Sequence, residues 1–99
     1  MSYERCVGLQ ISDEKLYQEY RDNMGPILER YRGHFRYDFN IALTLKSENG
    51  APISRVFILA FPDVEAHEQF FADPEYLAVR EKYFKPAVTH VTVMAEYEK

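Results

Sequence analysis

Alternation of apolar and polar side chains from His34 to Lys46 limits most strongly how this chain can fold. One set of alternate positions is apolar and the other mostly polar, with Phe35, Tyr37, Phe39, Ile41, Leu43 and Leu45 facing one way and His34, Arg36, Asp38, Asn40, Ala42 and Thr44 the other. A period of two predicts a strand with one face on a core. Residues 47–52 contain Asn49-Gly50 and form a turn, so Ile53–Phe61 is the partner strand of an antiparallel hairpin.

The segments around this hairpin divide into strands and helices. Tyr3–Ile11 and Ala87–Tyr97 alternate in the same way and predict two more strands. Ser12 is placed to cap a helix whose apolar residues recur at helical spacing, namely Leu16, Tyr20, Met24, Ile27 and Tyr31. Gly33 would follow the end of that helix, and a kink is expected near Asp22–Pro26.

Two shorter helices are expected after the hairpin. Asp63 caps the first, and Asp73, followed by a proline suited to the first helical position, caps the second. Pro86 ends the second helix before the last strand.

The resulting order, β-α-β-β-α-α-β, predicts an α+β ferredoxin-like fold with a four-stranded antiparallel sheet and helices on one face. Residues 1–99 are expected to form one domain. The other sheet face is expected to carry Phe57, Leu59, Val88 and Met94. Apolar area of that kind usually marks a binding surface, and the chain is rich in aromatics, with eight Tyr and seven Phe. A homodimer packed sheet to sheet, a dimeric α/β barrel, is therefore predicted.

Charge and composition exclude several classes of protein. A net charge of −4 argues against nucleic-acid binding, which needs a basic patch. No run of residues is long and apolar enough for a membrane span. Cys6 is the lone cysteine, which suits a reducing compartment, and the first residues form no apolar signal segment, so a cytoplasmic location is expected.

Several stretches resemble domain-of-unknown-function family 1330. They are Leu16–Tyr20, Pro26 with Tyr31, Gly33–Phe35, Arg55–Ala66 and Phe70–Tyr76. The resemblance implies a dimeric α/β barrel of the ferredoxin-like superfamily. Related barrels include cofactor-independent monooxygenases, lactone isomerases, dehydratases and haem-binding proteins, a likeness of fold that does not transfer an activity.

The candidate site is the polar side of the second strand. His34, Arg36, Asp38 and Asn40 would share one face, with Arg55 and His90 beside them and Gln10 widening the pocket. His34 or His90 would act as a general base, and Arg36 or Arg55 would hold an anion. The alternative is that this row faces water or forms salt bridges across a dimer seam.

Other residues point to no cofactor or metal. The three histidines are far apart in sequence, none has the spacing of a metal motif, and no cofactor fingerprint is present. His67 is expected on a helix surface, and Cys6 in a core or interface.

The sequence alone is compatible with two functions. One is a dimeric protein that binds a small molecule or performs cofactor-free proton-transfer or oxygenation chemistry in a pocket on the sheet. The other is a non-catalytic dimeric accessory or protein-interaction module. An enclosed cavity of roughly 300 Å³ or more would favour the first.

Overall fold

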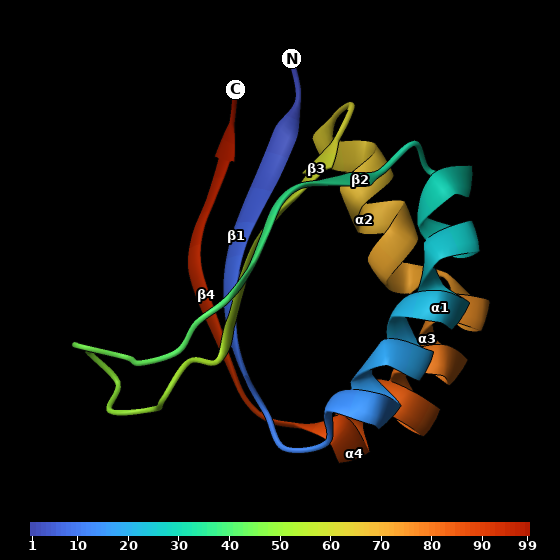
Figure 1. Ribbon diagram of the computed structural model, residues 1–99. Coiled ribbons are helices and arrows are strands. Elements are labelled where there is room, and N and C mark those ends of the chain that lie inside the picture. Colours follow the sequence, from blue (N-terminus) through green and yellow to red (C-terminus); the bar gives the residue numbers. More distant parts are fainter.

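The chain forms an antiparallel sheet with all of its helices on one face (Figure 1). The computed structural model describes residues 1–99. The strands lie in the order β2-β3-β1-β4 and comprise β1 (Tyr3–Ile11), β2 (His34–Asn40), β3 (Arg55–Phe61) and β4 (Val88–Glu98). The helical segments are α1 (Glu14–Arg30), α2 (Val64–Ala72), α3 (Pro74–Val79), the π-helical turn η1 (Arg80–Phe84) and α4 (Lys85–Ala87). The predicted fold class is confirmed.

The first helix is capped one residue later than predicted. Asp13, not Ser12, is the N-cap, and its side chain accepts a hydrogen bond from the Leu16 amide at 3.0 Å. The Ser12 hydroxyl instead donates to the Ala87 carbonyl, 3.1 Å away, and so ties the start of α1 to the start of β4. The predicted caps of the later helices, Asp63 and Asp73, are both confirmed.

The end of α1 also differs from the prediction. Arg32, not Gly33, takes the left-handed conformation, with φ of 57°. The Arg32 and Gly33 amides donate to the Glu29 and Leu28 carbonyls, which is the Schellman arrangement. Gly33 is needed for space instead, because a Cβ there would lie 2.4 Å from Leu28 Cδ1 and 2.9 Å from Phe61 Cε1.

The hairpin strands are shorter than predicted. β2 ends at Asn40, not Lys46, and β3 starts at Arg55. Beyond Asn40, one more ladder bond joins the Ile41 amide to the Ser54 carbonyl, and the Thr44 hydroxyl then bonds both backbone groups of Ile53. Residues 41–54, called the arm here, therefore leave the sheet as an irregular loop, which projects at the left of Figure 1.

A bulge interrupts the alternation of β2. Phe35 pairs with Leu59 and Tyr37 with Ile58, which leaves Arg36 as an extra residue. A bulge reverses the faces of the residues that follow it. The prediction that His34, Arg36, Asp38 and Asn40 share one face is therefore wrong, because Asp38 and Asn40 face the helices, while Tyr37 and Phe39 face away.

The core lies between the sheet and the helices. Phe57 and Leu59 belong to it, at 8% and 3% exposure, so their predicted place on the uncovered face is wrong. β3 is apolar on both faces, and periodicity alone could not fix its phase. Val88 also packs against the core, whereas Met94 is exposed.

A histidine on α2 also belongs to the interior. His67 is 4% exposed, so its predicted surface position is wrong. His67, Phe70 and Phe71 follow at helical spacing, and the His67 ring lies 4.7 Å from the Tyr3 ring and 4.9 Å from the Phe71 ring. None of the helices combines the length and apolar character that a membrane span requires.

Candidate functional site

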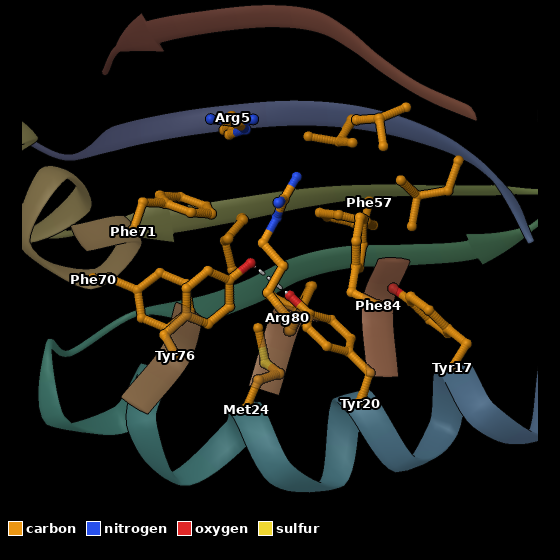
Figure 2. Close-up of a pocket in the computed structure, with 15 residues that line it drawn as sticks. Arg5, Tyr17, Tyr20, Met24, Phe57, Phe70, Phe71, Tyr76, Arg80 and Phe84 are labelled. Carbon is orange, nitrogen blue, oxygen red and sulfur yellow. Dashed lines mark hydrogen bonds between the residues drawn. The ribbon is translucent and has the colours of Figure 1, made fainter. Parts of the chain in front are cut away.

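A cavity of about 60 Å³ lies between the sheet and the helices and is called the chamber here. Its lining is mostly apolar and comes from every layer of the fold (Figure 2), comprising Arg5, Val7, Leu9, Tyr17, Tyr20, Met24, Phe35, Phe57, Leu59, Phe70, Phe71, Tyr76, Arg80, Phe84 and Val91. The volume is below the range of about 300–1,000 Å³ that is usual for drug-sized ligands. The chamber therefore suits only a small molecule, or part of a larger one.

Helical spacing on one side and strand alternation on the other aim these side chains inward. Tyr17, Tyr20 and Met24 follow one face of α1, and Tyr76, Arg80 and Phe84 recur every four residues through α3 and η1. β1 and β3 contribute alternate residues of their helix-facing sides, and β2 and β4 contribute one residue each, Phe35 and Val91. A π-helical turn such as η1 often lies at a functional site.

Two buried tyrosines supply the polar groups on the chamber floor. The hydroxyls of Tyr20 and Tyr76 lie 2.9 Å apart, and either can donate (Figure 2). Burial raises the pKa of Tyr20 well above its usual value and also raises the pKa of Tyr76. Both hydroxyls are therefore protonated at neutral pH and act as hydrogen-bond donors, not as bases.

Two arginines border the chamber. Arg5 comes from β1, and its guanidinium lies 4.8 Å from the centre of the Phe71 ring. Arg80 extends from the helical side toward the strands, with its guanidinium 5.4 Å from the centre of the Phe84 ring (Figure 2). Arg5 has a distant carboxylate partner in Glu96, at 3.8 Å.

The structure brings together three of the residues predicted for the site. Asp38, Asn40 and Arg55 meet on the helix-facing side, beside Arg21 and Tyr17 of α1. Arg21 donates to Asp38 at 2.6 Å and to the Tyr17 hydroxyl at 3.0 Å, while Arg55 donates to Asn40 at 3.0 Å and to Asp38 at 3.5 Å. These groups satisfy one another, so the network ties α1 to β2 and β3.

His34 and Arg36 lie on the opposite, uncovered side of the sheet, called the open face here. Arg36 pairs with Glu4, a carboxylate that is only 1% exposed, and the Tyr97 hydroxyl donates to the same carboxylate at 2.8 Å. Desolvation favours the neutral acid, but the Tyr97 hydrogen bond and the Arg36 charge outweigh it and lower the pKa of Glu4. His34 stands in the same cross-strand row, through Ala60.

Gln10 and His90 face each other across β1 and β4 on the open face. His90 is therefore on one edge strand and His34 on the other. Gly8, near Gln10 in β1, is covered by the arm, since a Cβ there would lie 3.0 Å from Ile53 side-chain atoms. The predicted site residues thus divide between the two faces.

The chamber residues were missed by the sequence interpretation. Tyr20 was assigned only to the apolar stripe of its helix, and Tyr17, Tyr76, Arg5 and Arg80 were assigned to no site. The spacing of Tyr76, Arg80 and Phe84 was the signal that could have identified an arginine on an apolar helical stripe. No group of three or more His, Cys, Asp or Glu side chains is placed to hold a metal ion.

This strand order, with helices on one face and an aromatic chamber beneath them, defines a ferredoxin-like α+β protein. The chain belongs to the family described as domain of unknown function (DUF1330), whose model matches residues 6–97. No curated protein matches it.

Solved structures share the fold at low identity. The RPA0582 protein of unknown function from Rhodopseudomonas palustris has a TM-score of 0.83 at 19% identity, over 99% of this chain and 82% of that one. A dabb family protein with a ferredoxin-like fold from Mesorhizobium loti has a TM-score of 0.69 at 17% identity, over 99% and 96%. A dimeric ferredoxin-like protein of unknown function from Bacteroides fragilis has a TM-score of 0.62 at 11% identity, over 99% and 96%.

Proposed function

We propose that this chain is a homodimeric binding protein that takes up a small, mainly apolar molecule in the chamber. The observation that carries the proposal is an aromatic cavity into which hydroxyl and guanidinium groups converge. Apolar pockets with a few oriented polar groups are the usual form of ligand sites. The single thiol of Cys6 is consistent with work in the cytoplasm.

Binding is favoured over proton-transfer or oxygenation chemistry that relies on a general base. The chamber is lined by no histidine or carboxylate, and its tyrosines are protonated at neutral pH. His34 and His90 lie on the open face at opposite edges of the sheet and could not serve the chamber together. A catalytic role for either histidine would need a second pocket, formed across a dimer.

The open face supports a homodimer. It carries exposed aromatic residues, with Tyr37 at 56%, Phe39 at 52% and Tyr97 at 37% exposure, and no helix covers it (Figure 1). An open hollow of about 420 Å³ lies between the arm and β4 and adds apolar atoms from Ile53 and Met94. Apolar area of this kind usually marks a protein interface. The dimeric Bacteroides fragilis relative has the same fold.

A second candidate function is the non-catalytic dimeric module that interacts with another protein. The closed network around Asp38 and the small volume of the chamber favour it, because a pure interaction module would keep its interior polar groups paired. It differs from the first proposal in requiring no ligand inside the chamber.

Two tryptophan variants separate the candidates. Val91 borders the chamber and is 45% exposed, so Val91→Trp should block the opening without disturbing the fold. Val64→Trp, at a comparably exposed position on α2, is the matched control. The binding proposal expects butanol to shift the amide NMR signals of Tyr20 and Leu9, two chamber residues, in the wild type and the control, but not in Val91→Trp. Unchanged shifts in all three proteins would support the interaction module instead.

A further inference from the structure

We infer that the ligand of the chamber carries a single negative charge, a carboxylate held by Arg80 with the Tyr20–Tyr76 hydroxyl pair. This inference rests on the proposed binding function and names the class of molecule bound. It follows from three observations on the chamber: an uncompensated cation, an unused hydroxyl proton and an apolar wall.

The uncompensated cation is Arg80. Arg80 is half-buried as a residue, and its guanidinium forms no ion pair and donates no hydrogen bond to another protein group. Arg21 is matched by Asp38 at 2.6 Å, and Arg5, the other arginine of the chamber, has a carboxylate partner at longer range, Glu96 at 3.8 Å. A guanidinium partly withdrawn from water gains from an anion that accepts its N–H groups. One unmatched positive charge suits one negative charge.

The unused proton belongs to the tyrosine pair. Two hydroxyls carry two protons, but the contact between Tyr20 and Tyr76 uses one of them, and neither oxygen has another partner. The second O–H can therefore donate to a molecule in the chamber. The Arg80 side chain lines the same chamber as this hydroxyl pair (Figure 2).

The apolar wall of the chamber determines the character and size of the uncharged part of the ligand. Apart from the tyrosine pair, this wall offers no hydrogen-bonding groups, because it is made of apolar side chains. They include Met24, Phe57, Leu59 and Phe70. A volume of about 60 Å³ leaves room for a few methylene groups. A short-chain carboxylate places its charge at Arg80 and its carbon chain against these side chains, whereas a sugar or a dianionic phosphate would leave polar groups unpaired.

The test compares butyrate with butanol, its neutral analogue, by NMR titration of the intact protein. We expect butyrate to bind more tightly than butanol, and Arg80→Gln to weaken butyrate roughly tenfold or more while butanol is unaffected. Arg80→Lys keeps the charge and should retain part of the preference. Lys82→Gln removes the same charge from an exposed position in the same turn, and it should change neither affinity.

Each alternative result has a distinct meaning. Equal affinities for butyrate and butanol, or equal losses in Arg80→Gln and Lys82→Gln, would overturn the carboxylate inference and leave the binding function standing. If neither compound binds the wild type, the proposed function falls together with the inference.

Discussion

The two faces of the sheet differ in whether their polar groups are paired and whether their apolar groups are exposed to solvent. On the helix-facing side, Asp38, Asn40 and Arg55 are bonded to one another and to α1, and the space that remains is apolar. On the open face, the buried Glu4 carboxylate and its exposed partner Arg36 lie beside aromatic side chains exposed to solvent. One face is complete within a single chain, and we propose that a partner chain completes the other. Ligand binding and assembly are therefore expected to be separable.

The largest expected effect is on assembly. Phe39→Asp places a charge on the open face, where Phe39 is 52% exposed, so the monomer should still fold. Burying that charge in an interface should raise the dimer dissociation constant roughly a hundredfold or more. Sedimentation equilibrium measures it. Leu77→Asp, at a 47% exposed apolar position on α3, is the control and should leave the dimer intact. Equal weakening by both variants would place the interface elsewhere.

The second largest effect is expected on the stability of the fold, through the hydrogen-bond network on the helix-facing side of the sheet. Asp38→Asn removes the negative charge between Arg21 and Arg55, whose side chains are each 14% exposed. We expect a loss of about 2 kcal/mol in the free energy of unfolding, because two half-buried cations would then face each other. Urea denaturation measures it. Glu75→Gln breaks the exposed Arg30–Glu75 pair and should cost about 0.5 kcal/mol or less. Similar losses for both would mean that the network does not hold α1 in place.

A smaller loss in the free energy of unfolding is expected when the Glu4 carboxylate of the open face is removed. The pKa of Glu4 is lower in the folded protein than its usual 4.5, so Glu4 stabilises the fold above that pH, and the stabilisation is lost as the pH falls through the folded pKa. Glu4→Gln should cost about 1 kcal/mol at pH 7 and should flatten the dependence of stability on pH between about 5 and 3. Urea titrations at several pH values measure this, and an unchanged slope would contradict it.

The smallest effect is expected on the reaction rate of the Cys6 thiol. Cys6 lies in the same cross-strand row of the open face as Tyr37 and Ile58. Burial raises the pKa of Cys6, and a dimer would shield it further. Ellman's reagent should therefore react a few-fold faster with Phe39→Asp than with the wild type. Equal rates would show that the partner does not cover this row.

The sequence identified the fold well because periodicity and caps are local signals. The order of elements was predicted from alternation and spacing, and two aspartate caps were predicted from residue type and position. The candidate site was predicted less well because one bulged residue, Arg36, reverses the faces of Asp38 and Asn40. Alternation gives no sign of a bulge, since it is set by the pairing with β3. Arg5 and Arg80 are distant in sequence, and only the packing of α3 and η1 on the sheet brings both to one chamber.

Native mass spectrometry of the wild type and Phe39→Asp, each with butyrate, tests the separation of the two faces most directly. We expect a wild-type dimer with one butyrate on each chain and a Phe39→Asp monomer that still binds one butyrate. A monomeric wild type, or a folded Phe39→Asp monomer that no longer binds butyrate, would contradict it.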